Sequence, residues 1–170
     1  NEMQEGLLEA AAALGFFGIS IPEQYGGMAL SRFARTLVHE MAGRTGFGFA
    51  GVLASHTGIG SDALVTLGNA AQKQRYLPRM ATGELRAAFA LTEPEAGSDA
   101  GSVRTTARRR GDHYLLNGTK HFISGGSRAG VVTVVARTGA GPRPKELSVV
   151  PVGHGAPGLP VGALCHALGT

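Results

Sequence analysis

The sequence is poor in the residues that define several classes of protein. Its 170 residues include one cysteine, no tryptophan and only 6% aromatic residues. The single thiol, Cys165, cannot form an internal disulfide and has no second cysteine with which to build a CxxC metal site, so a reducing compartment fits best. No apolar run approaches the roughly 20 residues that span a bilayer. A disulfide framework and a membrane-spanning helix are therefore not expected.

Several catalytic and nucleotide-binding signatures are also missing. Glycine is abundant, at 27 residues, but there is no GxGxxG between a strand and a helix, no GxxxxGK[ST] and no GxSxG elbow. The histidines show no HxxxH or HxH spacing, so no metal site is predicted. The six are His39, His56, His113, His121, His154 and His166.

The charge of the sequence favours no particular polymeric partner. The net charge is +4, but the basic residues are spread along the chain except for Arg108-Arg109-Arg110. This triplet is interpreted either as the solvated end of a hairpin or as an anion or nucleic-acid contact. Few aromatic residues lie near it, which gives little support to stacking on single-stranded nucleic acid. We expect no nucleic-acid partner.

The first half of the sequence has helical patterns. The content of 43% hydrophobic and 16% charged residues suits a globular protein. Helices are predicted at about 6–17, 31–45, 49–67 and 69–84 from helix-forming residues and apolar spacing. Ser31 and Asn69 are candidate N-caps. Pro78 is expected to break or kink the fourth helix, and His56 is interpreted as a helix-packing residue.

Beyond residue 86 the runs become short and rich in β-branched or aromatic residues. Gly111-Asp112 and Asn117-Gly118 are strong turn signals between them. The predicted fold class is α+β: an N-terminal all-α domain at residues 1–86, followed by an antiparallel β-barrel-like middle domain at residues 87–170.

The stretch LTEPEAGSD, residues 91–99, ends the predicted strand AAFAL abruptly. Pro94 fixes φ, and the Gly97-Ser98 turn exposes backbone N–H groups and a hydroxyl. Such a turn can receive an anion, and Thr92 and Ser98 can donate to carbonyl or phosphate oxygens. The same residues also fit an ordinary turn whose hydroxyls bond their own backbone.

A second irregular stretch, NGTKHFISGG, spans residues 117–126. It places an aromatic ring, Phe122, close to a hydroxyl, Ser124, and to two glycines. A flat ligand with polar edges would be recognised by a ring that covers one face and a hydroxyl that bonds one edge. Alone, this is also a common pattern at the end of a strand.

Together the two stretches resemble the acyl-CoA dehydrogenase family. Ala90 to Asp99 matches a family motif like A-x-T-E-P-x-A-G-S-D, and Gly111 to Gly126 matches G-D-x-Y-x-L-N-G-x-K-x-[WF]-I-[ST]-x-G. IPEQYGG at 21–27 and GAPGLPVG at 155–162 are similar to other family segments, so the resemblance covers nearly the whole sequence. FISGG and the glycine-proline loop after residue 138 look most like the isobutyryl-CoA, short branched-chain type.

The resemblance implies a flavoenzyme that introduces an α,β double bond into an acyl-CoA, with FAD accepting the β hydride at N5. By this resemblance Phe89, Leu91 and Thr92 line the pyrimidine edge, and Phe122 covers the ring where many relatives have Trp. Ser124 bonds near flavin O4 and N5. The implied cofactor-binding set is Phe89, Leu91, Thr92, Gly97, Ser98, Phe122, Ile123 and Ser124, with Gly97 and Ser98 near the pyrophosphate and Ser98 also touching the substrate.

The resemblance places the catalytic carboxylate of the family in a C-terminal helical domain, which we expect to be absent from this sequence. No catalytic residue is therefore assigned here, and Glu93 is interpreted as a carboxylate that orders its loop. Because the sequence begins with Asn1 rather than Met, we expect a fragment or a processed product. Without that carboxylate, we expect the fragment to be inactive alone.

The resemblance also implies partners and a compartment. These are an acyl-CoA substrate, an electron-transfer flavoprotein as acceptor and a homo-oligomer when full length. The compartment would be the cytoplasm in a bacterium or the mitochondrial matrix in a eukaryote, although no targeting signal is visible. Two alternatives stay open: a related flavoenzyme acting on a carrier-protein thioester, and a non-catalytic interaction protein that retains the fold.

Overall fold

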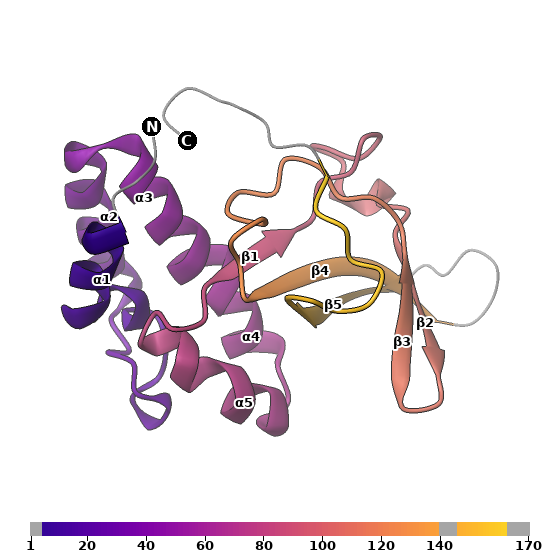
Figure 1. Ribbon diagram of the computed structural model, residues 1–170, viewed down its shortest axis with the longest axis horizontal. Helices are drawn as coiled ribbons and strands as arrows, with labels where there is room; N and C mark the ends of the chain where they lie inside the picture. Colours follow the sequence, from indigo (N-terminus) through magenta and orange to yellow (C-terminus); the bar gives the residue numbers. More distant parts are fainter. Residues whose placement is uncertain (1–4, 140–145, 163–170) are drawn as a thin grey trace.

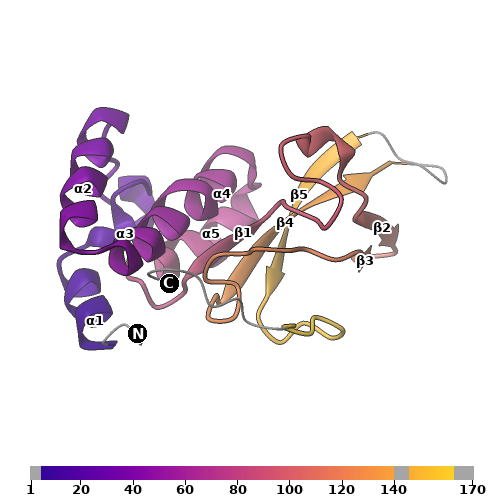
Figure 2. The ribbon, with the colours of Figure 1, turned by 90° about the horizontal axis from the view of Figure 1, so that it is seen from above.

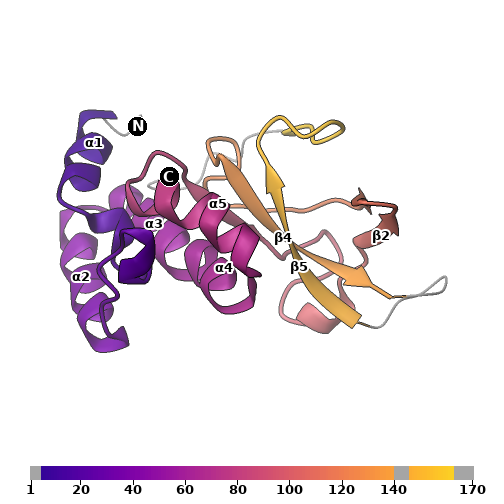
Figure 3. The same ribbon diagram turned by 90° about the horizontal axis from the view of Figure 1, so that it is seen from below.

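The computed structural model describes residues 5–139 and 146–162 of the chain. Helices gather at one end of the molecule and strands at the other, with α4 and α5 next to β1 (Figures 1, 2 and 3). The α-helices are α1 Glu5–Ala13, α2 Arg32–Thr45, α3 Phe47–Ala54, α4 Ser61–Leu67 and α5 Ala70–Ala81. The strands are β1 Ala87–Ala90, β2 Thr106–Arg110, β3 His113–Asn117, β4 Val131–Thr138 and β5 Glu146–Gly153.

The two predicted helix caps are confirmed. The Ser31 hydroxyl accepts a hydrogen bond from the Ala34 N–H at 3.2 Å at the start of α2. Asn69 forms a reciprocal capping box with Gln72 at the start of α5. The expected break at Pro78 does not occur, because α5 continues to Ala81. The missing N–H of Pro78 leaves one carbonyl of the preceding turn without its helical donor, and only three residues of α5 follow the proline.

The helix expected over residues 49–67 is divided by a π-helical segment, Ser55–Gly60, between α3 and α4. A π-helical turn inserts an extra residue and rotates the side chains that follow it. His56 and Thr57 are consecutive in sequence, yet both are buried there. The prediction of a helix-packing role for His56 is confirmed.

His56 joins the helices to the sheet. Its Nδ1 accepts a hydrogen bond from the Ala87 N–H of β1 at 3.1 Å, and its Nε2 lies 3.0 Å from the Met80 carbonyl oxygen of α5. Because Nδ1 is an acceptor, the proton of the neutral ring is on Nε2 and is donated to Met80. The imidazole ring also packs edge-on against the Phe17 ring, with 5.1 Å between the ring centroids.

The sheet is mixed, so the expectation of a purely antiparallel domain was wrong. Strand β4 pairs in parallel with β1 and, at Thr106↔Arg137, with β2. It pairs antiparallel with β5, and β2 with β3. Turn signals in the sequence reveal hairpins such as β2–β3, but parallel pairing depends on strands far apart in sequence. Continuous burial of β4 from Val131 to Ala136 fits a strand covered on both faces.

Strands β1 and β2 lie one after the other along the same edge of β4, because β5 pairs with β4 along its whole length. The chain leaves this edge after Ala90 and rejoins it at Thr106. Residues 91–105 therefore form an excursion from the sheet, which we call the edge loop. This explains why the run AAFAL ends abruptly in a turn-rich segment.

The two faces of β1 contact different parts of the core. Ala88 and Ala90 pack with Val132 and Val134 of β4, with Ile123 beside them. On the other face Ala87 packs against α4 and α5, and Phe89 packs against the edge loop. Alternation along the strand thus separates a helix-covered face from one that meets the second motif.

One helix leaves an apolar stripe on the surface. Phe33, Leu37 and Met41 of α2 fall at the predicted helical spacing, and all three are exposed. The stripe shows that amphipathic spacing alone does not tell whether a helix face is buried in this part of the chain.

We predict that Gly27→Ala destabilises the protein by about 2–3 kcal/mol, as overpacking does at a site that cannot yield. An added Cβ would lie 2.0 Å from the carbonyl oxygen of Ile21, a fully buried residue. The thermal midpoint of the full-length protein measures the loss. Gly43→Ala is the control: it is an exposed position in α2 with open space, where alanine should stabilise by up to about 1 kcal/mol. Equal midpoints for the two variants would contradict the prediction.

Candidate functional site

The two sequence motifs meet at the base of the edge loop. The Lys120 ammonium donates to the Leu91 carbonyl oxygen at 2.8 Å and to Glu93 Oε1 at 2.8 Å. The next residue, His121, donates its backbone N–H to the Thr92 carbonyl oxygen at 2.8 Å. Three consecutive residues of one motif are thereby bonded to two consecutive residues of the other.

Glu93 organises the edge loop, as the sequence predicted. Its Oε2 accepts from the Arg104 N–H at 2.6 Å and its Oε1 from the Thr105 N–H at 2.9 Å, so the carboxylate closes the loop across its base. Burial by itself would raise the pKa of Glu93. The hydrogen bonds from Lys120, Thr105 and Arg104 outweigh burial and lower that pKa to about 2.

A close backbone contact explains the glycine of the second motif. A Cβ on Gly118 would lie 2.2 Å from the Thr105 hydroxyl oxygen and 2.7 Å from the Thr105 Cα. The segment after β3 therefore passes directly against the end of the edge loop. Only a residue without a side chain allows this approach.

Phe122 has an unusual conformation for its residue type. Its φ is +54°, one of two positive values among the non-glycine residues of the described chain. The side chain is 70% exposed, and its ring stacks on His121 with centroids 3.9 Å apart. A bulky residue held at positive φ with an exposed ring is typical of a strained functional position.

The polar groups of the motifs are available to a ligand. Within the described residues, the hydroxyls of Thr92, Ser98 and Ser124 make no hydrogen bond, and Gly97 has open space at its α-carbon. The alternative in which Thr92 and Ser98 only bond their own backbone is thus not observed. Three free donors lie on the two segments that Lys120 and His121 join.

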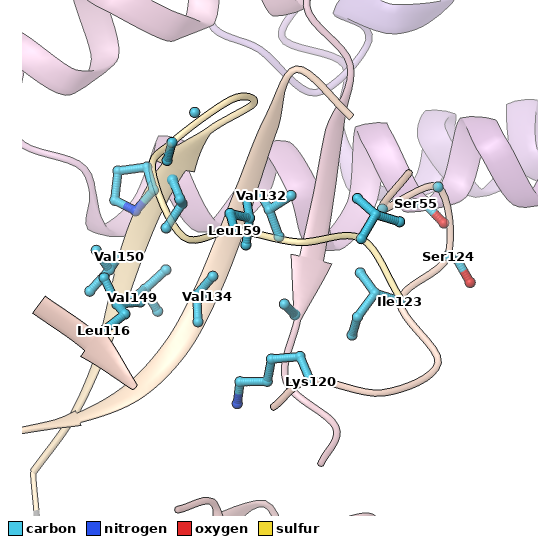
Figure 4. Close-up of a pocket in the computed structure, with 18 of the residues that line it drawn as sticks. Ser55, Leu116, Lys120, Ile123, Ser124, Val132, Val134, Val149, Val150 and Leu159 are labelled. Carbon is cyan, nitrogen blue, oxygen red and sulfur yellow. The ribbon is translucent and has the colours of Figure 1, made fainter. Parts of the chain in front are cut away.

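The predicted site residues do not all line one surface. Phe122, Ile123 and Ser124 line a wide groove. Val132 and Val134 of β4 line it as well, and Figure 4 shows them with Ile123 and Ser124. The helical part contributes Phe49, Val52 and Tyr76 to the same groove. Phe89 and Leu91 instead pack against Ala96 and Val103 of the edge loop, on the other face of the sheet. There they stabilise the loop and do not line the groove.

Comparison with known proteins decides the family. Residues 1–84 match the N-terminal domain of acyl-CoA dehydrogenases, and residues 88–170 match the middle domain. The chain belongs to the acyl-CoA dehydrogenase family. The resemblance seen in its two motifs is confirmed over nearly its whole length.

The similar proteins include acyl-CoA dehydrogenases of several kinds. An acyl-CoA dehydrogenase of Bacillus subtilis is 38% identical over 99% of this chain and 45% of its own length. Isobutyryl-CoA dehydrogenase of Dictyostelium discoideum is 38% identical over 96% of this chain and 39% of its own. The crystal structure of an acyl-CoA dehydrogenase of Bacillus anthracis complexed with FAD has a TM-score of 0.79 and 43% identity, covering 87% of this chain and 25% of that one. The chain spans less than half the length of each.

FAD is the cofactor of this family, and the residues present fit it. The free hydroxyls of Thr92 and Ser124 can bond the edge of a flavin ring, and the exposed face of Phe122 can cover the ring. The open turn at Gly97 leaves room for a phosphate near the Ser98 hydroxyl.

Sequence reasoning assigned no role to Lys120 and His121, although both stand in the second motif. The only signal was a lysine at a fixed place in a loop of otherwise neutral residues. Its partner carboxylate, 27 residues earlier, could not be paired with it from spacing alone.

Two further features were sought in the described residues, a metal site and a membrane-spanning helix. Among the described residues no cluster of three metal-ligating side chains occurs, and no helix there is long and apolar enough to cross a membrane. Cys165 and His166 lie outside the described residues.

Proposed function

We propose that the full-length protein is an FAD-dependent dehydrogenase that oxidises a short or branched acyl-CoA to the 2,3-enoyl-CoA. The observation that carries the proposal is the joining of the two motifs by Lys120 and His121. It places an exposed ring and three free hydroxyls on adjacent segments. The likeness to isobutyryl-CoA dehydrogenase supports the substrate class.

When bound, FAD would supply the hydride acceptor at N5. The Thr92 hydroxyl would donate to the pyrimidine edge and Ser124 near O4 and N5, where hydrogen bonds favour the electron-rich reduced ring. Phe122 would cover one face of the ring. Ser98 and Gly97 would hold the pyrophosphate, and Ser98 would also contact the CoA arm.

The groove on the Phe122 side suits an acyl thioester. Valines of β4 and the Phe49 and Val52 side chains give it apolar walls, and Ser55 and Ser124 give it polar points. None of the carboxylates described at the site is proposed as the base, because Glu93 is engaged by three donors and is held ionised.

The proposal includes the partners that the family resemblance implies. The reduced protein would pass electrons to an electron-transfer flavoprotein, and the full-length chain would form a homo-oligomer. The compartment would be the cytoplasm of a bacterium or the mitochondrial matrix of a eukaryote, and two of the similar proteins are named as mitochondrial.

The test is the flavin spectrum of the full-length protein, taken anaerobically with a series of acyl-CoA thioesters. We expect the oxidised flavin band to bleach with short branched substrates. Phe122→Ala should raise the dissociation constant of FAD about tenfold, the value of one stacking contact of about 1.4 kcal/mol. Phe33→Ala is the matched control, since Phe33 is 74% exposed and Phe122 70%.

Distinct outcomes would contradict distinct parts of the proposal. A protein that binds no FAD would not be a flavoenzyme. A protein that binds FAD but bleaches only with a carrier-protein thioester would be the alternative flavoenzyme. Equal FAD affinity in Phe122→Ala and Phe33→Ala would remove Phe122 from the flavin site.

A further inference from the structure

The link between Lys120 and the edge loop lies outside the strand ladders. Strand β1 ends at Ala90 and β3 at Asn117, so neither sheet pairing fixes residues 91–93 against residues 120–122. The described contacts that do so are the two hydrogen bonds of the Lys120 ammonium and the one from the His121 N–H. We call this arrangement the clasp.

The clasp is buried, which is unusual for a lysine. The Lys120 side chain is 11% exposed and the Glu93 side chain 4%. A lysine usually keeps its ammonium in water while its methylene stem covers apolar surface. A buried ion pair is often no more stabilising than well-packed apolar residues of similar volume, so stability alone is a weak reason to have one here.

The clasp lies between the groups that would contact the cofactor. Thr92 lies between Leu91 and Glu93, the two residues bonded by the Lys120 ammonium, and its own carbonyl accepts from the His121 N–H. Phe122 is two residues after Lys120. The half-buried Thr92 side chain makes no hydrogen bond in the described structure, and the exposed Phe122 ring stacks only on His121, the residue next to Lys120. Sites that bind a rigid planar ligand need such groups held within a fraction of an ångström by supporting residues.

We propose that Lys120 is a positioning residue for the flavin. Its ammonium, held by Glu93, keeps the Thr92 hydroxyl and the Phe122 side chain at the separation needed for the hydroxyl to reach the edge of the flavin and the phenyl ring to cover its face. This inference rests on the proposed function. Lys120 touches neither the cofactor nor the substrate in it. Its effect passes through the backbone of Leu91 and through the chain to Phe122.

The test uses the full-length protein loaded with FAD. In Lys120→Met the edge loop loses both ammonium hydrogen bonds, and the dissociation constant of FAD should rise about tenfold to a hundredfold. The reduction potential should become more negative by about 30 mV for each tenfold loss in preference for the reduced flavin, since hydrogen bonds to that form weaken. The absorption band should also shift. Lys120→Gln retains an uncharged NH₂ donor group and should be intermediate in all three quantities, which keeps the test valid if the methionine variant does not fold.

The control separates positioning from stability. Gly27→Ala lowers stability through a contact in the helical part, and Gly27 is not among the residues of either motif. It should keep the FAD affinity, potential and spectrum of the wild type. If the Lys120 variants match Gly27→Ala in these three quantities, the inference is wrong while the proposed function stands. If the wild-type protein itself binds no FAD, both are wrong.

Discussion

Glu93→Gln is expected to lower the free energy of unfolding at pH 7 by about 3–5 kcal/mol, the usual cost of breaking a buried ion pair from one side. The Lys120 ammonium would lie buried with only the Leu91 carbonyl as its charge-stabilising partner. The glutamine amide group would also face one of the three donors that the carboxylate accepts. Thermal and urea midpoints of the full-length protein measure the effect.

The lowered pKa of Glu93 also predicts how the stability of the protein changes with pH. Glu93 has its pKa lowered from 4.5 to about 2 by folding, so the unfolded chain binds the proton first as pH falls. The stabilisation is complete above pH 4.5 and is lost as pH falls toward 2, by about 3 kcal/mol. The difference between wild type and Glu93→Gln should therefore shrink over this window.

Glu95→Gln is the matched control for the same loop. The Glu95 carboxylate is 63% exposed and lies 3.9 Å from Arg104, so its loss should change stability by less than about 0.5 kcal/mol. A Glu93→Gln variant as stable as Glu95→Gln at pH 7 would show that the carboxylate does not hold the edge loop.

His56→Leu is expected to destabilise the protein at pH 7 by about 3 kcal/mol. It leaves the Met80 carbonyl and the Ala87 N–H without partners at the junction of α5 and β1, and each unpaired buried group costs about 1–3 kcal/mol. It also removes the edge-on contact with Phe17. The urea midpoint of the full-length protein reports the loss.

Burial lowers the pKa of His56 from 6.5 to about 4, although the hydrogen bond to Met80 opposes the shift. Between pH 6.5 and 4, His56 is therefore protonated in the unfolded chain and neutral in the folded protein. Stability should fall by about 3 kcal/mol across this window as pH decreases. In His56→Leu this component should be missing. His154→Leu, at an exposed histidine whose side chain makes no hydrogen bond in the described structure, should keep it.

Much of the helical part follows from local sequence. The caps at Ser31 and Asn69 need only neighbouring residues, and both form as predicted. The sequence did not predict the π-helical segment at Ser55–Gly60, because the run 49–67 is mostly small and apolar and has no clear polar face whose rotation would reveal the inserted residue. The helix continues through Pro78 because the proline falls close to its end.

The family could be recognised from two sequence motifs that are rich in turn residues and hydroxyl groups and that include an aromatic residue. The sequence also identified Glu93 as a loop carboxylate, because this residue does not match the position of the catalytic base in the family that the motifs resemble. Both conclusions depend on which residue types occur close together in the sequence, and this information is present without a structure.

How the two motifs are joined became clear from the three-dimensional arrangement of the strands. The parallel pairing of β4 with β1 and β2 makes residues 91–105 an excursion from one sheet edge. Glu93 closes that excursion, and the Lys120 contacts join it to the second motif across 27 residues of sequence for Glu93 and 29 for Leu91. Pairings at such separations depend on the path of the chain between them, and periodicity within a window of a few residues carries no information about that path.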